Sequence, residues 1–320
     1  MRNFDPRGAA VLGALALFAG AGAARTQPPA QGFALDRFYP APAGAGWFVM
    51  DDLDMHGGLG GAVELTAGTA HDPLVVPGPG GGRLAVVSDE AVTDVGAAVT
   101  YGRWRFYLDL PMPLLLAGSS GTAAGYAFTA PAVSLGTNPD SIPDASFGAA
   151  LRLLGEAGSA FRLGLGAQLF VPSNGPLDTR ATYLTDGTVR AMARLLAAGD
   201  LGPWRYAGQV GVHVRPLDDA PIPGSPEGSE WLFGAAAGRA FDVHSGWALI
   251  AGPEVYGESA MRAFLGAGTT GVEGLLTGRL EGTGEGAQLR FKVGAGGGLD
   301  PSFGAPEWRA VAAVELFSGG

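Results

Sequence analysis

The chain lacks cysteine altogether and is poor in charge. Only 16% of its 320 residues are charged, and 20 basic residues stand against 30 acidic ones, for a net charge of −10. Without cysteine there is no disulfide framework, no thiolate metal site and no lipid-anchored N-terminal cysteine. Without a basic cluster there is no face suited to DNA or RNA, so a nucleic-acid partner is excluded.

Long apolar runs are missing as well. After residue 24 no stretch approaches the roughly 18 uninterrupted apolar residues expected of a membrane-spanning helix. Apolar side chains nevertheless make up 47% of the chain, and glycine is abundant, with 55 residues. High apolar content with low charge argues against disorder. Glycine spread through alternating segments is typical of a β-barrel, whose strands bend and whose interior takes small residues.

Residues 1–24 have the three-part pattern of a secretory signal peptide. Arg2 and Arg7 give a positive start, Ala9–Ala23 is a small and apolar run, and small residues near its end offer a cleavage site. The alternative is a membrane-anchor helix. The run of about 15 residues falls short of the roughly 20 that span a bilayer. We therefore predict export and exclude this segment from the fold.

The rest of the chain alternates with a period of two, the pattern of strands with two different faces. In Phe161–Val171, for example, leucines occupy one face while Arg162, Gly164 and Gln168 occupy the other. About twelve such segments, each near the 9–11 residues of a tilted membrane-spanning strand, can be counted. They are Gly60–Thr69, Ala91–Tyr101, Trp104–Pro113, Ala145–Leu154, Ala160–Val171, Thr188–Ala198, Trp204–Arg215, Glu230–Phe241, Trp247–Tyr256, Thr270–Leu280, Ala287–Gly297 and Glu307–Phe317.

Short and long connections alternate between these segments. Gly102–Arg103 is a short one and Leu114–Asp144 a long one. Outer-membrane barrels sort their connections in this way, with short periplasmic turns and long extracellular loops. We therefore predict an all-β fold, a closed antiparallel transmembrane barrel formed by residues 60–320. An even number of strands puts both termini on one side, predicted to be the periplasm.

Residues 25–59 precede the predicted barrel and form a periplasmic N-terminal segment. This segment is expected either to cap the periplasmic mouth or to add a strand. Phe33, Leu35 and Phe38 within it need burial, which favours docking over a free tail.

Aromatic side chains flank the short turns, as expected of an interfacial girdle. The alternative is that aromatics simply favour strands. That alternative does not explain why they gather beside one class of turn. The predicted girdle comprises Tyr101, Trp104, Phe161, Trp204, Phe241 and Trp247.

The inward face carries the candidate functional residues. They either line a selective aqueous passage, with arginines favouring anions, or form mutually paired charges that fill a narrow lumen. The lumen-lining candidates are Glu64, Asp94, Arg105, Asp109, Arg152, Arg162, Arg190, Arg194, Arg205, Gln209, His213, Arg215, Glu254, Glu273, Arg279, Arg290, Lys292, Arg309 and Glu315.

No catalytic, metal or cofactor site is predicted. A barrel hydrolase would need a nucleophile beside a base such as His213, and no serine is placed there by sequence. The acidic residues Asp51, Asp52 and Asp54, near His56, lack the spacing of a known calcium loop. They are interpreted as solvated loop acids.

Several short motifs resemble the barrel domain of the large OmpA-type outer-membrane proteins of Gram-negative bacteria. They are Phe33–Phe38, Trp47–Asp51, Leu151–Glu156, Gly187–Arg190, Gly199–Pro203, Gly228–Glu230, Gly252–Tyr256 and Gly304–Glu307. Such proteins often continue into a peptidoglycan-binding domain, whereas this chain stops just after Phe317. That aromatic resembles the C-terminal signal read by barrel-assembly machinery, displaced by three residues.

The sequence therefore predicts a non-catalytic outer-membrane protein, structural or porin-like. Its expected partners are outer-membrane lipid and the assembly machinery, with passage of a small solute as an open question. The first alternative is a solute-specific, anion-preferring uptake channel. Further alternatives are a barrel enzyme and a soluble secreted β-protein, and the apolar outward faces argue against the latter.

Overall fold

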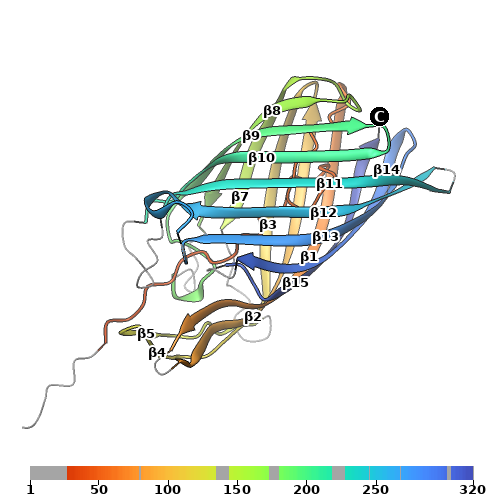
Figure 1. Cartoon of the computed structure of the whole chain (residues 1–320). Coiled ribbons are helices and arrows are strands. Elements are labelled where there is room, and N and C mark those ends of the chain that lie inside the picture. Colours follow the sequence, from red (N-terminus) through yellow and green to blue (C-terminus); the bar gives the residue numbers. More distant parts are fainter. Residues whose placement is uncertain are drawn as a thin grey trace, which may run out of the picture.

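A computed structural model describes residues 27–78, 81–134, 144–172, 180–217, 228–244, 246–266, 268–300 and 304–319. The predicted signal peptide therefore lies outside the described residues. Twelve strands form one closed antiparallel barrel, which confirms the predicted fold (Figure 1). They are β1(Leu59–Pro77), β2(Arg83–Tyr101), β3(Trp104–Ala117), β7(Ala145–Leu154), β8(Arg162–Val171), β9(Arg190–Leu201), β10(Trp204–Val214), β11(Glu230–His244), β12(Trp247–Ala260), β13(Thr270–Gly282), β14(Gly286–Asp300) and β15(Trp308–Gly319).

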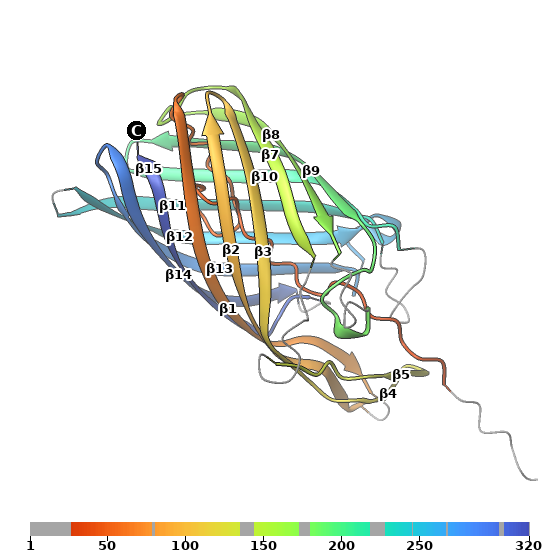
Figure 2. The ribbon, with the colours of Figure 1, turned by 180° about the vertical axis from the view of Figure 1, so that it is seen from behind.

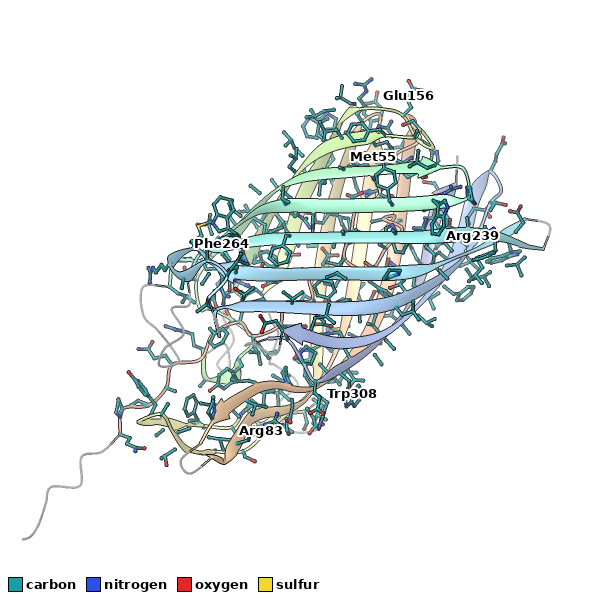
Figure 3. The ribbon with its side chains drawn as sticks, viewed as in Figure 1. Met55, Arg83, Glu156, Arg239, Phe264 and Trp308 are labelled. Carbon is teal, nitrogen blue, oxygen red and sulfur yellow. The ribbon has the colours of Figure 1, made fainter. Side chains whose placement is uncertain are left out.

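Each strand pairs with its neighbour in sequence, and β1 pairs with β15 to close the ring. Short connections such as Gly102–Arg103 gather at one end, which we call the turn mouth. The longer connections gather at the opposite end, the loop mouth (Figure 2). In Figure 3, Glu156 and Arg239 mark the turn mouth, and Phe264 and Arg83 mark the loop mouth. The predicted sorting of connections is therefore observed.

The structure differs from the prediction in the segment 70–90, which was expected to be a loop. β1 and β2 instead continue to Pro77 and Arg83 as a hairpin that projects beyond the barrel (Figure 1). Alternation weakens there because both faces of the hairpin are partly covered. Smaller elements lie near the loop mouth: β4(Gly121–Ala123), β5(Tyr126–Phe128), β6(Val133–Ser134), and the 3-10 turns η3(Arg180–Thr182) and η4(Met261–Ala263). Across the described residues, no helix is long and apolar enough to cross a bilayer.

The two faces of the barrel have opposite chemistry. Outward side chains are apolar and open, with Leu165 48%, Val210 55% and Leu276 70% exposed. Inward side chains are mostly charged and buried, among them Arg162, Glu254 and Glu315. A period of two along each strand produces this division, because successive side chains point to opposite sides of the sheet.

Residues 27–58, which we call the plug, run through the barrel from mouth to mouth. At the loop mouth, the Ala30 amide donates to the Ala127 carbonyl, and the Leu35 amide donates to the Tyr183 carbonyl. At the turn mouth, the Gly58 carbonyl accepts from the Gly102 amide, and β1 begins one residue later. Figures 1 and 2 show this part of the chain, coloured red, entering the barrel.

The course of the plug changes two expectations. Phe33, Leu35 and Phe38 are buried, as their apolar character requires, but they pack inside and over the barrel. The described chain starts at the loop mouth, whereas Gly319 pairs with Gly286 at the turn mouth. The expectation that both ends share one side is therefore wrong for residues 27–319, because the plug crosses the lumen before the first strand.

Candidate functional site: the plugged lumen

The predicted lumen residues do face inward, and the plug is what most of them bind. Of the nineteen candidates, only Asp94 and Arg205 are half-buried; the others are buried. Those that make hydrogen bonds or ion pairs with plug atoms are Arg105, Arg152, Arg162, Arg190, Arg215, Glu254, Arg279, Arg290, Lys292, Arg309 and Glu315. The charges therefore hold a protein segment in place in this state.

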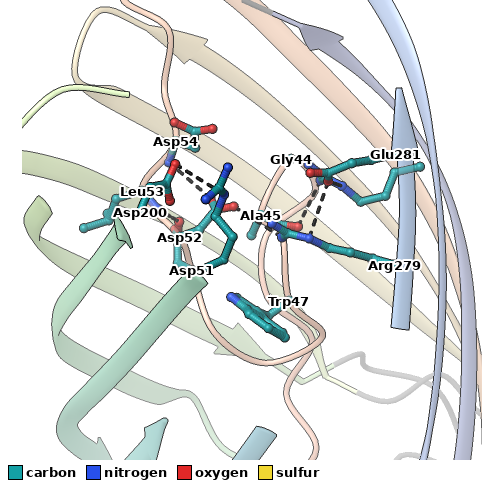
Figure 4. Close-up of polar contacts among 12 residues, drawn as sticks. Gly44, Ala45, Trp47, Asp51, Asp52, Leu53, Asp54, Asp200, Arg279 and Glu281 are labelled. Atoms are coloured by element: carbon teal, nitrogen blue, oxygen red, sulfur yellow. Dashed lines mark hydrogen bonds and ion pairs between the residues drawn. The ribbon is translucent and has the colours of Figure 1, made fainter. Parts of the chain in front are cut away.

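At the turn mouth, two plug carboxylates lie among wall arginines (Figure 4). Asp51 pairs with Arg105 at 2.6 Å, and Asp52 pairs with Arg279 at 3.5 Å. The interpretation of these aspartates as solvated loop acids is therefore wrong, since they are 3% and 6% exposed.

Backbone carbonyls of the plug bind further arginines nearby. Arg152 donates to the Met55 carbonyl at 2.7 Å and to the Leu53 carbonyl at 3.1 Å. Arg162 donates to the Asp52 carbonyl at 2.9 Å and also pairs with Asp200 at 3.0 Å. Each guanidinium offers five donors in a fixed fork, so it can join an irregular backbone to the wall.

Halfway through the lumen, Glu254 on β12 binds the plug backbone directly. Its two carboxylate oxygens accept from the Phe48 and Val49 amides, each at 3.0 Å. The Thr277 hydroxyl donates to the same carboxylate at 2.7 Å. Glu254 is 0% exposed, so these three donors replace its hydration shell.

A second carboxylate, Glu315, links the plug to a network of wall charges. It accepts from the Gly44 amide at 3.0 Å and from Arg290 at 2.9 Å. Lys292 lies 3.7 Å from Glu315 and 2.8 Å from Glu64. Glu64 is therefore linked to the plug through Lys292 and Glu315.

At the loop mouth the plug joins both the wall and a loop. Asp36 pairs with Arg309 at 2.7 Å, and Arg309 pairs in turn with Glu273 at 2.7 Å. In the loop after β8, Asp186 accepts from the Ala34 amide at 2.7 Å and pairs with Arg215 at 2.7 Å. Burial would raise the pKa of Asp186, but Arg215 more than offsets it and lowers the pKa well below its usual range.

Glycines on the inner wall provide space for the large plug side chains. A Cβ added at Gly238 would lie 2.7 Å from the Trp47 ring, and one at Gly294 would lie 3.0 Å from the Phe48 ring. At Gly164 it would lie 2.8 Å from the Leu53 side chain. These positions are recesses in the wall, because a larger residue would occupy the space taken by the plug.

The remaining lumen candidates bind one another or lie apart. Arg194 donates to the Tyr107 hydroxyl at 2.9 Å and to Gln168 at 3.0 Å, with Gln209 at 3.4 Å. Arg205 lies at the turn mouth, 3.5 Å from Asp200. The six girdle aromatics lie beside the turn mouth on the outer face, five of them exposed and Trp247 half-buried.

His213 is fully buried at the loop mouth, beside Gln209 on its strand as expected. Its Nδ1 lies 3.2 Å from Glu258, and its ring packs against Tyr39 and Phe170. With Glu230 it forms a cluster compatible in distance with a metal ion. Arg37 and Arg215 already pair with Glu230, so this cluster has cationic partners of its own.

Sequence reasoning missed several residues of the site. Glu90 and Glu258 share the inward parity of Asp94 and Glu254, four residues away, but they lie outside the predicted strand spans because the strands run longer than those spans. Glu230 lies within a predicted strand, and it shares the parity of the inward Gly234, which indicates that its side chain also points inward. Asp36 and Arg37 follow no strand pattern, so no periodic signal could place them.

No protein-family model and no curated protein sequence matches the chain. Among solved structures, it is similar to an outer-membrane channel from Pseudomonas putida F1, with a TM-score of 0.49 and 16% identity over 82% of this chain and 96% of that one. It is also similar to the NanC porin, with a TM-score of 0.46 and 7% identity over 81% and 99% of the two chains. An anion-selective porin from Comamonas acidovorans has a TM-score of 0.33 and 10% identity over 81% and 98%. At these identities the likeness concerns the barrel architecture alone, and the resemblance to OmpA-type barrels stays a prediction.

Proposed function

We propose that this chain is a non-catalytic outer-membrane barrel of porin-like architecture whose lumen is closed by its own N-terminal segment. The observation that carries the proposal is the plug itself. Residues 27–58 fill the lumen from mouth to mouth and bind the charges that would otherwise line a passage.

The location in a membrane rests on the outer face. Many leucine, valine and phenylalanine side chains around the barrel are 36–79% exposed, as in Phe106 at 54% and Leu316 at 51%. A soluble protein rarely exposes a continuous apolar surface of this kind. Lipid would cover it, while closure of the ring leaves no unpaired strand edge.

The non-catalytic part rests on the surroundings of His213. Its described neighbours are carboxylates, arginines and aromatic rings, and no hydroxyl or thiol nucleophile bonds to its ring in the described part of the chain. Nucleophilic catalysis needs such a pair.

Conductance of the refolded full chain in a planar bilayer tests the closed state. We expect no steady conductance steps from protein whose folding is verified by heat-modifiable migration. The double variant D51N/D52N should produce openings, because it leaves Arg105 buried without its carboxylate partner and leaves Arg279 with Glu281 alone. The matched control D242N/E285Q changes two exposed turn acids and should stay silent. Steady steps from the unmodified chain would refute a closed lumen.

A gated, anion-preferring channel is the second candidate, and one observation favours it. The plug carries four aspartates and one arginine, a formal charge of −3. Its departure would remove the carboxylate partner of Arg105 and one of the two carboxylate partners of Arg279, which keeps Glu281 at 3.5 Å. Openings of D51N/D52N should then favour chloride over potassium in a salt gradient, whereas cation selectivity would exclude this candidate.

A further inference from the structure

A cavity of about 90 Å³ lies between the plug and the wall at the loop mouth. It is bordered by β2, β3, β7, β8 and β9, which are consecutive neighbours in the sheet (Figure 2). Five carboxylates line it: Asp36, Glu90, Asp94, Asp109 and Asp144. Three other cavities lined by described residues of the lumen each have at least as many arginines as carboxylates.

Two of the five carboxylates are neutralised by arginines. Asp36 pairs with Arg309 at 2.7 Å, and Asp144 pairs with Arg190 at 2.8 Å. These ion pairs hold the plug and the start of β7 in place, so they are not available to a ligand.

The other three have no cationic partner at ion-pair distance among the described residues. Glu90 is 5% exposed, and its Oε2 accepts no hydrogen bond. Asp94 makes no hydrogen bond or ion pair within the described part of the chain. Asp109 accepts only from the Ser146 hydroxyl at 3.2 Å. We call Glu90, Asp94 and Asp109 the acidic row.

Buried carboxylates without partners are costly, because removal from water is compensated only by a cation, a proton or hydrogen-bond donors. The row is also extended. Glu90 and Asp94 are four residues apart on one strand face, or roughly 13 Å. Asp109 lies opposite Gly96, further toward the turn mouth. A ligand that satisfies the row must therefore carry more than one positive charge, with the charges spaced apart.

A single metal ion does not fit this spacing. The described residues contain two clusters that bring three metal-ligating atoms within 4.8 Å of one another, and neither includes the acidic row. Between the carboxylates, the cavity is lined by apolar and aromatic side chains, namely Phe38, Tyr39, Val92, Pro111, Phe170 and Tyr183. Methylene groups pack on such a lining, and aromatic faces attract ammonium groups.

We propose that the acidic row binds a linear aliphatic polyamine at the loop mouth. Its ammonium groups pair with the carboxylates of Glu90, Asp94 and Asp109, and its methylenes lie on the aromatic lining. The cavity volume equals that of about three waters, at roughly 30 Å³ each. This volume accommodates a short alkyl segment between two ammonium groups.

Isothermal titration of the refolded full chain with spermidine, in detergent at pH 7.5, tests the proposal. We expect saturable binding that weakens at least about tenfold in E90Q/D94N, since each lost charge-assisted pair contributes to affinity. The matched control is D89N, because Asp89 lies on the same strand but faces outward, where it binds His71 at 3.1 Å. D89N should bind spermidine like the unmodified chain.

Three results would overturn the proposal. One is no spermidine binding by folded protein, which would mean that protons neutralise the row. Another is spermidine binding that E90Q/D94N leaves unchanged. The last is calcium binding that E90Q/D94N abolishes while spermidine does not bind. Because plug residues line the cavity, the inference rests on the proposed closed lumen. Binding is measured without conductance, so failure of this inference can be told apart from failure of the proposed function.

Discussion

Removal of the Glu254 carboxylate is the sharpest test of how the plug is held. In E254A, the buried Phe48 and Val49 amides and the Thr277 hydroxyl lose their shared acceptor. No other acceptor is bonded to these two amides in the described structure. E254Q keeps the shape of the side chain but only one acceptor oxygen.

The magnitude follows from the two orphaned amides. A buried donor left without a partner costs about 1–3 kcal/mol, so E254A should destabilise the docked plug by about 2–6 kcal/mol. At about 1.4 kcal/mol per tenfold, local opening becomes roughly 30-fold to 10⁴-fold more frequent. The frequency of local opening in E254Q should lie between that of E254A and that of the unmodified chain.

Hydrogen–deuterium exchange measures this opening directly. Peptides that contain Phe48 and Val49 should exchange faster by the stated factor in E254A, while peptides from β8 keep their protection. The control E285A removes an exposed turn carboxylate and should change neither region. Unchanged exchange at residues 48–49 in E254A would show that Glu254 does not retain the plug, and the reasoning would fail.

Three further changes test other parts of the description. Replacement of Gly238 by valine should displace the Trp47 ring and cost about 1–3 kcal/mol of stability. In a variant where Trp47 is the only tryptophan, the displacement should appear as a red shift of the fluorescence emission. An unshifted emission spectrum would contradict the recess. Replacement of outward Leu165 by arginine should destabilise the membrane-inserted barrel by about 2–4 kcal/mol in urea unfolding from vesicles, and a neutral effect would contradict burial in lipid. Because the folded pKa of Asp186 is lowered, its pairing with Arg215 stabilises the fold fully above the ordinary aspartate pKa of about 3.9 and is lost as the pH falls through the folded pKa. The protection factor of the Ala34 amide, which corrects exchange for its intrinsic pH dependence, should thus stay constant from pH 5 to 8 and fall only in stronger acid. A fall in this protection factor near pH 6 would contradict the assignment.

Alternation in the sequence predicts the barrel well because the membrane imposes two opposite environments on every strand. Leu165 and Arg162 occupy the faces that parity assigns to them. Strand ends are less predictable: β1 and β2 continue past the predicted spans, where protein rather than lipid covers them. Phe33 and Leu35 pack there against Leu74 and other residues of the projecting hairpin.

The plug could not be placed from the sequence, because irregular backbone has no period. Its apolar Trp47–Met50 run and the following aspartates are visible, but their partners lie on distant strands. Trp47 fits beside Gly238, and Asp51 meets Arg105, only after the ring has closed. The burial of Phe33 was predictable from its apolarity; its location was not.

The path of the plug also constrains the order of assembly. The plug enters at one mouth and continues into β1 at the other, so it cannot be removed sideways from a closed ring. The pairing of Ala62 with Phe317 joins the first and last strands, so the sheet must wrap around residues 27–58 or the chain must later be drawn lengthwise through it. Wrapping makes the plug a template whose charges recruit each strand before the ring is sealed. The pairing of β1 with β15 is then the last contact formed, and it encloses the plug in the barrel.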